Sequence, residues 1–200
     1  MSTPTPIEFW YDFGSNYSYL AVMRIEALAT AHGVPLLWRP FLLGPIFKSF
    51  GWDNSPFVLQ KEKGEYVWKD MVREGAKYGL PFRRPTTFPR TAVQATRVAL
   101  LGSQAPWGAE FSRRIMLLNF ALDQDIGSDA LVGAVLKDMG LPHEALMAAA
   151  RADEVKARLR DQVAHAHRIG IFGAPTCFVG TEMFWGNDRL DDAVKFAAGR

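Results

Sequence analysis

The sequence predicts an α/β fold in which both ends of the chain share one sheet and a helical segment is inserted between them. Strand-like apolar runs lie near the two ends, at Ile7–Phe13 and Leu36–Phe41 and again between Thr176 and Trp185. From Glu65 to Arg168 the signals are helical. The simplest assembly pairs strands from both ends in one sheet, with a helical domain inserted in its middle.

A sharp turn joins the first strand to the first helix. Ile7–Phe13 is aromatic and ends at a glycine, and helix-forming residues follow from Tyr17 to Ala31. Gly14-Ser15-Asn16 forms the turn, with glycine supplying the conformational freedom that it needs. Gly33 ends the helix, and Leu36–Phe41 is a second short strand. This strand–helix–strand order predicts a right-handed parallel crossover.

The middle of the chain begins with a loop-rich section, Leu42–Gly64. The elements that follow are predicted helices, each punctuated by a capping residue or a glycine stop. They are Glu65–Tyr78, a helix capped by Thr91 and ending at Gly102, Trp107–Asp123, a helix capped by Ser128 and ending at Gly140, a short helix opening at Pro142, and Glu154–Arg168 capped by Asp153.

The strand pattern returns only near the end. Thr176–Val179 and Glu182–Trp185 flank Gly180-Thr181, which is typical of a two-residue hairpin turn. A last helix is predicted over Asp188–Ala198.

Composition excludes several classes of protein. Two hundred residues with 48% hydrophobic content are ample for a packed core. Lysine and arginine number 23 against 21 acidic residues, a net charge of +2 without a basic patch, which argues against a nucleic-acid binder. The single cysteine, Cys177, excludes an internal disulfide, a dithiol redox motif and a cysteine-based metal cluster within one chain.

The opening residues and the hydropathy of the chain bear on its location. Met1–Pro6 has neither the basic flank nor the apolar core of a signal peptide, and no apolar run approaches the length of a membrane span. The expectation is a cytoplasmic protein that does not bind membranes.

Ser15 is a candidate functional residue because it is expected at or just before a helix N-terminus. Unpaired backbone N–H groups and the helix dipole favour an anion there. Its hydroxyl can cap the helix, as serine often does, or it can hold the thiolate of a ligand. From the first strand and helix alone the two interpretations are evenly matched.

Two late segments are candidate ligand contacts. Ala174-Pro175 precedes the third strand, and a cis peptide bond there would turn the backbone of Ala174 outward toward a bound peptide, although trans is the commoner isomer. After the hairpin, Trp185-Gly186-Asn187-Asp188 opens the last helix. Asn187 or Asp188 can be a simple N-cap, or this turn can hold the carboxylate and ammonium groups of a ligand.

Together these motifs resemble the 2-hydroxychromene-2-carboxylate isomerases, relatives of kappa-class glutathione transferases in the thioredoxin-like superfamily. The resemblance spans nearly the whole chain. Its motifs are the serine turn, Phe41–Lys48, Gly79–Phe82, Gly173–Thr176 and Phe184–Leu190. It implies a thioredoxin-like fold, residues 1–43 and 169–200, with an inserted helical domain, residues 44–168.

The resemblance also implies a glutathione site and a role for each matching residue. Ser15 would hold and activate the glutathione sulfur, and Ala174 beside Pro175 would pair with the cysteinyl backbone. The γ-glutamyl end would be held by Trp185, Gly186, Asn187 and Asp188. Lys48, with Asn54 and Ser55, would face the carboxylates of the substrate and of glutathione.

The implied reaction is a glutathione-dependent cis–trans isomerisation of 2-hydroxychromene-2-carboxylate or a related aromatic-degradation intermediate, with relatives suggesting a homodimer. The alternatives are a kappa-like transferase or peroxidase and a non-catalytic thiol- or peptide-binding protein. The substrate and the fate of glutathione stay open.

Some residues depart from the family pattern. Asn16 replaces a frequent proline, which predicts a looser turn, and Thr91 replaces a frequent asparagine, which puts a substrate contact from that loop in doubt. Arg90 beside it either contributes to the site or lies on the surface. Cys177 is either a buried residue or a thiol near glutathione.

Overall fold

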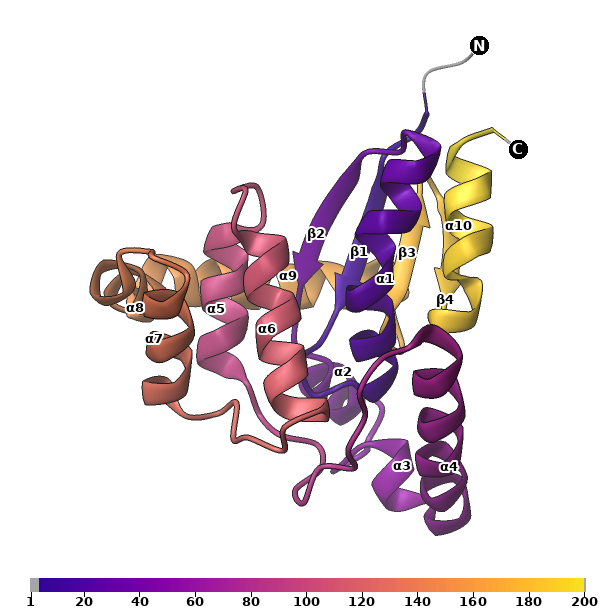
Figure 1. Cartoon of the computed structure of the whole chain (residues 1–200), viewed down its shortest axis with the longest axis horizontal. Helices are drawn as coiled ribbons and strands as arrows, with labels where there is room; N and C mark the ends of the chain where they lie inside the picture. Colours follow the sequence, from indigo (N-terminus) through magenta and orange to yellow (C-terminus); the bar gives the residue numbers. More distant parts are fainter. Residues whose placement is uncertain (1–3, 200) are drawn as a thin grey trace.

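A computed structural model of the chain describes residues 4–199 and, within them, one four-stranded sheet in the order β2-β1-β3-β4. Strands β1 (Ile7–Tyr11) and β2 (Leu36–Pro40) are parallel, whereas β3 (Thr176–Val179) pairs antiparallel with β1 and with β4 (Glu182–Trp185). The predicted sheet shared by both ends of the chain is confirmed, as are the parallel pairing of the first two strands and the hairpin across Gly180-Thr181 (Figure 1).

The helices between and beyond the strands fill the rest of the molecule (Figure 1). Their bounds are α1 Asn16–His32, α2 Gly44–Ser49, α3 Pro56–Leu59, α4 Lys61–Tyr78, α5 Val93–Gly102, α6 Gly108–Phe120, α7 Asp129–Asp138, α8 His143–Arg151, α9 Asp153–Arg168 and α10 Leu190–Ala197, with a 3-10 helix, η1, at Asn187–Arg189.

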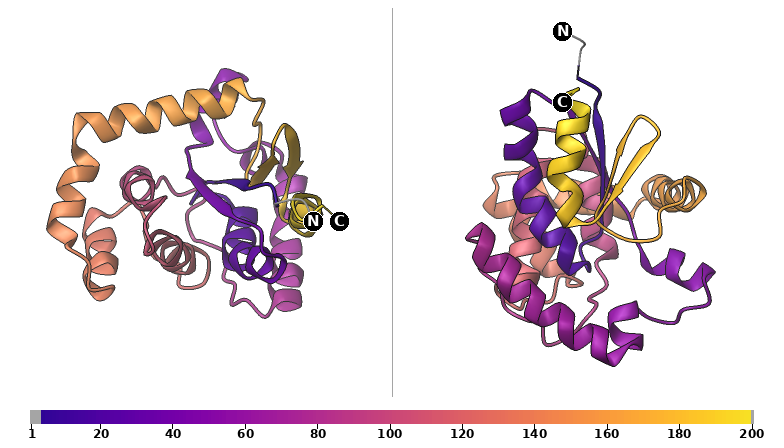
Figure 2. Two further views of the ribbon diagram at one scale, coloured as in Figure 1. Left: turned by 90° about the horizontal axis from the view of Figure 1, so that it is seen from above. Right: turned by 90° about the vertical axis from the view of Figure 1, so that its right-hand side faces the viewer.

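Strand β1 feeds two apolar layers because successive side chains of a strand point to opposite faces. Phe9 and Tyr11 join the larger core, together with α1 and α10. Trp10 points the other way and packs with Ile46 of α2 and Ala166 of α9. Figure 2 shows α1 and α10 on one side of the strands and α9 on the other.

Several predicted boundaries were wrong in the middle of the chain. The section Leu42–Gly64, expected to be loop-rich, contains α2, α3 and the first turn of α4. Both short helices carry a proline in their first turn, where its missing N–H costs nothing, and each is too short to show a helical period. Thr91 and Asp153 are not N-caps; Ala92 and Ala152 hold those positions.

Other helix ends agree with the sequence. Ser15 and Ser128 cap α1 and α7 by accepting hydrogen bonds from Ser18 N and Leu131 N. Gly33 ends α1 in the left-handed conformation, with φ of 67°.

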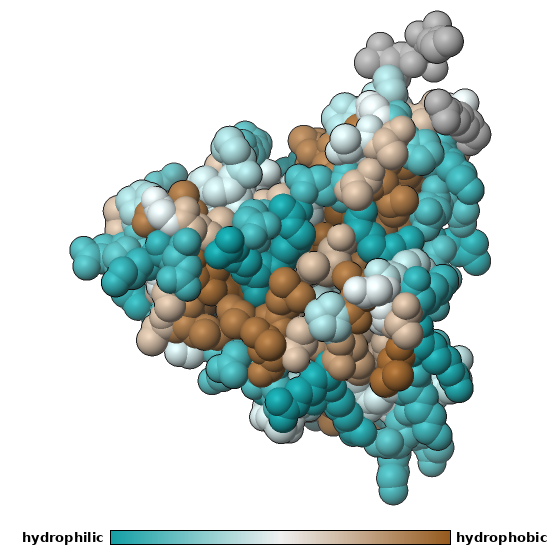
Figure 3. Space-filling model, viewed as in Figure 1, coloured by the Kyte–Doolittle hydropathy of each residue, from teal (hydrophilic) through white to brown (hydrophobic). Residues whose placement is uncertain are grey.

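The helices of the central segment share one core with the sheet. Phe111 and Ile115 of α6 are buried in the same cluster as Phe9 of β1 and Leu20 of α1. The division into residues 1–43 plus 169–200 and residues 44–168 stays a prediction. Figure 3 shows hydrophobic residues gathered over the lower parts of α5 to α7, with hydrophilic residues over much of the rest of this face. Across residues 4–199, no helix combines the length and the apolar character that crossing a bilayer requires.

Candidate functional site

The turn before α1 is fixed by the partly buried carboxylate of Asp12. Its two oxygens accept hydrogen bonds from the backbone N–H groups of Gly14 and Leu43, both at 2.6 Å. Burial raises the pKa of Asp12, and these hydrogen bonds act in the opposite direction. A side chain at Gly14 would place a Cβ atom 2.9 Å from the carbonyl oxygen of Arg90, so glycine lets the two segments meet.

Ser15 combines the two roles that the sequence left open. Its Oγ accepts a hydrogen bond from Ser18 N at 3.2 Å, which caps α1, and it donates one to the carbonyl oxygen of Ala174 at 2.8 Å. The peptide bond between Ala174 and Pro175 is cis. The serine turn and the proline loop, far apart in the sequence, are therefore in direct contact.

Asn16 occupies the first position of α1 and is 1% exposed. Within residues 4–199 neither atom of its side-chain amide has a hydrogen-bond partner. The turn is nevertheless held by the bonds to Asp12, including one from Ser15 N to the Asp12 carbonyl at 3.0 Å. Proline is thus not needed here to define the turn.

The proline loop is joined to the segment after β4. Gly186 N donates a hydrogen bond to the carbonyl oxygen of Pro175 at 3.0 Å, and the φ of Gly186 is 110°, a region that favours glycine. The rings of Trp185 and Phe172 pack edge to face, with their centroids 4.8 Å apart. A Cβ atom on Gly173 would lie 2.3 Å from Trp185 Nε1, so that glycine lets the indole lie against the loop.

Asn187 and Asp188 are not N-caps, because both lie within η1 and the N-cap positions of η1 and α10 are Gly186 and Arg189. In the described part of the chain no side chain caps η1 or α10, so the N-cap interpretation was wrong, and α10 begins later than predicted. Asn187 is buried, and its Oδ1 accepts a hydrogen bond from Arg24 of α1 at 2.8 Å. Asp188 is exposed beside the cis-proline loop, next to Gly186.

The three predicted contacts from the central segment lie on α2 and at the start of α3. Lys48 is exposed on α2, whose buried residue Ile46 packs in the same cluster as Ala174. Ser55 caps α3 by accepting a hydrogen bond from Phe57 N at 3.3 Å, and Asn54 Oδ1 accepts one from Ser55 N at 2.8 Å. Asn54 Oδ1 and Ser55 Oγ thus each accept a local hydrogen bond, and the role of the two residues toward a ligand stays a prediction.

Cys177 is a core residue. It is 2% exposed in β3, between Phe9 of β1 and Phe184 of β4. Burial raises the pKa of its thiol to about 12. Of the two interpretations, the buried residue is confirmed.

A buried polar network that the sequence did not predict joins the turn to the loop before α5. Arg90 donates hydrogen bonds to Asn119 Oδ1 at 3.0 Å and to Asp123 Oδ1 at 2.5 Å, and Asn119 Nδ2 donates to the Phe13 carbonyl at 2.9 Å. A hydrogen bond from Thr86 N and the guanidinium of Arg90 lower the pKa of Asp123 to about 2. Arg90 is therefore a structural residue of the loop rather than a surface one.

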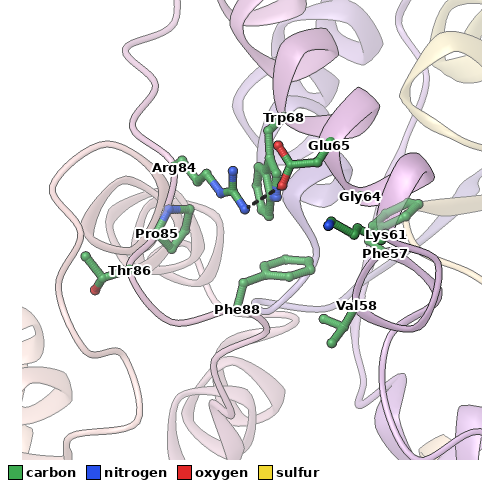
Figure 4. A pocket seen from close by; sticks show the side chains of 10 residues that line it. All are labelled: Phe57, Val58, Lys61, Gly64, Glu65, Trp68, Arg84, Pro85, Thr86 and Phe88. Carbon is green, nitrogen blue, oxygen red and sulfur yellow. Dashed lines mark hydrogen bonds and ion pairs between the residues drawn. The ribbon is translucent and has the colours of Figure 1, made fainter.

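A cavity of about 330 Å³ lies between α3, α4 and residues 84–88 (Figure 4). Phe57, on one wall, packs edge-on against Tyr17 of α1. Phe88 forms another wall of the cavity. It precedes Pro89, whose Cβ atom would lie 3.6 Å from a Cβ atom added to Gly14. A second cavity, of about 450 Å³, lies between α2, α5 and α9.

No metal centre emerges from residues 4–199, where no three histidine, cysteine, aspartate or glutamate side chains are grouped to hold an ion. The groups that the structure brings together here are the N-terminus of α1, the Ser15 hydroxyl and the backbone of the proline loop.

Comparison with known proteins gives the site its context. The DSBA-like thioredoxin domain matches residues 6–197. The chain is 30% identical to a 2-hydroxychromene-2-carboxylate isomerase from Sphingobium xenophagum, over 92% of this chain and 94% of that protein. It is 26% identical to glutathione S-transferase kappa 1 from Rattus norvegicus, over 94% and 88% of the two chains.

A solved structure of a 2-hydroxychromene-2-carboxylate isomerase superposes with a TM-score of 0.86 at 25% identity, covering 97% of this chain and 94% of the other. The thioredoxin-like fold is thereby confirmed. The chain belongs to the DSBA-like thioredoxin family and, within it, to the group of 2-hydroxychromene-2-carboxylate isomerases, to which the kappa-class glutathione transferases are related.

Proposed function

We propose that this protein is a glutathione-dependent cis–trans isomerase acting on 2-hydroxychromene-2-carboxylate or a related aromatic-degradation intermediate, with a trans-hydroxybenzylidenepyruvate type of product. The observation that carries the proposal is the 2.8 Å contact between the Ser15 hydroxyl, at the N-terminus of α1, and the Ala174 carbonyl. Relatives named as isomerases and as glutathione transferases support it.

The residues at this contact fit a cysteinyl group. A serine hydroxyl has one proton to donate, and in this structure it donates that proton to the Ala174 carbonyl. With a thiolate beside it, the hydroxyl can turn to donate to the sulfur while Ser18 N continues to cap through the same oxygen. The Ala174 carbonyl is then free to accept the cysteinyl N–H, so that one exchange of partners would satisfy both groups.

Ser15 and the start of α1 would favour the ionised sulfur. A free thiol has a pKa of about 8.5, so little of it is thiolate at neutral pH. Donation from the hydroxyl and the positive end of the helix dipole both lower the pKa of a thiol at this position. Ser15 is therefore assigned as the stabiliser of an anion rather than as the attacking nucleophile.

The remaining family positions would orient the tripeptide. Trp185, Gly186, Asn187 and Asp188 would hold its γ-glutamyl end, and Lys48, with Asn54 and Ser55, would face carboxylates from the central segment. When bound, glutathione would supply a thiolate that adds to the ring-opened enone and turns its double bond into a rotatable single bond. Loss of the thiolate after rotation would restore the double bond in the trans geometry and regenerate glutathione. The homodimer rests on the resemblance to relatives and the cytoplasmic location on the sequence, and both stay predictions.

Ser15→Gly tests the proposal, because glycine at an N-cap costs only a few tenths of a kcal/mol yet removes the hydroxyl. We expect turnover, followed by the ultraviolet change of the substrate, to fall about 10- to 100-fold, the factor for a hydrogen bond to a charged group. Ser128→Gly is the matched control, because it removes the equivalent cap of α7 by the same change of residue.

The concentration of free thiol separates the alternatives in the same assay. An isomerase leaves glutathione unconsumed, whereas a kappa-like transferase or peroxidase uses it in proportion to product. Saturable binding of glutathione without turnover of any substrate would indicate a binding protein. Equal rates for Ser15→Gly and the unaltered protein would contradict the assignment of Ser15.

A further inference from the structure

The second cavity, of about 450 Å³ between α2, α5 and α9, is lined mainly by aliphatic side chains. Pro45 and Ile46 come from α2, Val93 from the start of α5, and Leu159 and Val163 from α9. Among residues 4–199, no acidic side chain and no phenylalanine, tyrosine or tryptophan ring lines it. Its volume lies within the range of small-molecule pockets, roughly 300–1,000 Å³.

Helix α9 presents one continuous face to the second cavity. The lining residues of α9 follow the i, i+3, i+4, i+7 spacing of a single helical face. They are Lys156, Leu159, Arg160, Val163, Ala164 and His167. Apolar and basic side chains alternate along this face, so the helix offers both apolar contact and positive charge to an occupant.

The positive charges at the second cavity are only partly compensated. Lys156 pairs with Asp153 at 2.8 Å, but the Asp153 side chain is 97% exposed, so water screens its charge. His167 Nε2 lies 3.3 Å from Ser49 Oγ, at the α2 end of the cavity.

Arg97 of α5 and Arg160 of α9 have uncommitted guanidinium groups. Within residues 4–199 neither takes part in an ion pair or a hydrogen bond. The Nε atom of Arg97 is buried without a hydrogen-bond partner, and a buried donor left unpaired destabilises the structure that holds it. An anion in the second cavity would supply the missing charge and acceptors.

The second cavity is separate from the Ser15–Ala174 contact. None of the residues predicted to hold glutathione lines it. Ile46 lines the cavity and packs in the same apolar cluster as Ala174, so α2 connects the two places although they share no lining residue. An occupant of the second cavity would therefore leave the position of glutathione free.

We propose that the second cavity is a binding site for a medium-chain aliphatic carboxylate. The alkyl chain would lie against the aliphatic lining, and the carboxylate would accept hydrogen bonds from Arg97 and Arg160. A guanidinium suits this role because its planar fork of N–H donors matches the two oxygens of a carboxylate. Small inorganic anions, which cover no apolar surface, and alkyl amines, which carry the wrong charge, are excluded as preferred ligands. The site does not depend on the proposed isomerase activity.

Calorimetry with octanoate tests the inference, in the presence of excess glutathione. The unaltered protein is expected to bind octanoate about tenfold more tightly than the uncharged octanamide, the factor for a hydrogen bond to a charged group. Hexanoate should bind more weakly than octanoate, by about fourfold for each methylene group removed. Acetate, which has the head group without the chain, should give no measurable binding.

Arg160→Gln tests the charge. We expect it to weaken the binding of octanoate about fivefold, the factor for an exposed ion pair, and to leave the affinity for octanamide unchanged. Arg158→Gln is the matched control, because Arg158 is another exposed arginine of α9 that does not line the cavity.

Ala164→Leu tests the aliphatic lining. Ala164 is exposed on α9, so a leucine there would fill part of the cavity without removing a core contact, and leucine keeps a high helix propensity. We expect octanoate and octanamide to be weakened alike, by at least about fourfold, the factor for one displaced methylene group. The melting temperature of each variant checks that it is folded.

Each contrary outcome overturns a stated part of the inference. Equal affinities for octanoate and octanamide, or equal losses in Arg160→Gln and Arg158→Gln, overturn the role of the charge, and an Ala164→Leu variant that binds normally overturns the cavity as the site. Octanoate binding that excess glutathione abolishes would place the carboxylate at the glutathione site instead.

A second copy of the chain is the other possible occupant of this face. In that case sedimentation would show a dimer that Arg160→Gln dissociates and Arg158→Gln does not, and octanoate would fail to bind, which also overturns the inference. Failure of glutathione to bind in a separate titration would contradict the proposed function alone and would leave the carboxylate site standing.

Discussion

One hydroxyl at Ser15 serves the fold and the proposed chemistry through different atoms. Its oxygen accepts from Ser18 N, which stabilises the start of α1, while its proton is available to a partner across the turn. The cap uses a lone pair of the oxygen, whereas the proposed chemistry uses the proton. Binding of a sulfur therefore need not break the cap. A helix that began with alanine would have neither.

Cys177 provides a prediction about reactivity. Burial in β3 raises the pKa of its thiol to about 12 from an ordinary value of 9.0, so that almost none of it is thiolate at neutral or mildly alkaline pH. We expect a thiol reagent to leave the native protein unmodified at pH about 8 and to label one thiol per chain after unfolding, since labelling requires the thiolate. Formation of a mixed disulfide with glutathione in the native state would contradict this placement.

Individual residues differed in how far the sequence could predict them. Ser15 was predictable because a serine between a strand and a helix has a local role that neighbouring residues define. Arg90 and Asp123 were not, since each depends on a partner distant in the chain that only the folded structure reveals. Asn187 resembled a cap locally, but Arg24 of α1 holds its side chain.

A network of hydrogen bonds centred on Asp123 holds the loop before α5 in place. Its carboxylate accepts from Thr86 N at 2.9 Å and pairs with Arg90, and both side chains of the pair are nearly buried, at 7% and 6% exposed. Asp123 also has a φ of 56°, a region that aspartate and asparagine tolerate better than most residues. The network places Phe88 at the cavity and Arg90 against Gly14.

Asp123→Asn is expected to lower the melting temperature at neutral pH, because it leaves the charge of Arg90 buried without its partner. The folded-state pKa of about 2 is below the ordinary 3.8, so the carboxylate stabilises the fold above about pH 4 and loses that effect as the pH falls through about 2. The difference between variant and unaltered protein should therefore shrink over that range.

Thermal unfolding at a series of pH values makes this comparison. Asp129→Asn is the control, because Asp129 pairs with Arg151 at a surface where both side chains are about half exposed. A difference in melting temperature that stays constant from neutral pH to about pH 2 would contradict the role given to the Asp123 carboxylate.

Among the secondary-structure elements, the long and strongly patterned ones were predictable and the short ones were not. The aromatic strand β1 and the helix α1 follow from their residues, whereas α2 and α3 have only six and four residues. The packing of Ile46 against Trp10 and Ala174 stabilises α2, and this contact joins segments that are far apart in the sequence.

At the scale of the whole molecule, the fold brings two distant segments of the chain to the same end of the two central strands of the sheet. The β1–β3 pairing, with Phe9 opposite Cys177, aligns the ends of these strands so that the turn after β1 faces the loop before β3. That juxtaposition creates the Ser15–Ala174 contact, which neither end of the chain could form alone. The sequence predicted the shared sheet, but the contact itself depends on the register of the strands.

The central claim is that Ser15 and the start of α1 hold a bound thiol in its ionised form. The most direct test is a pH titration of glutathione bound to the protein, followed by the ultraviolet absorbance of the thiolate, in the unaltered protein and in Ser15→Gly. The account predicts a bound thiol with a pKa well below the free value of about 8.5, and a clear upward shift when the hydroxyl is removed. Saturable binding with an unshifted pKa, or a lowered pKa that Ser15→Gly leaves unchanged, would contradict it.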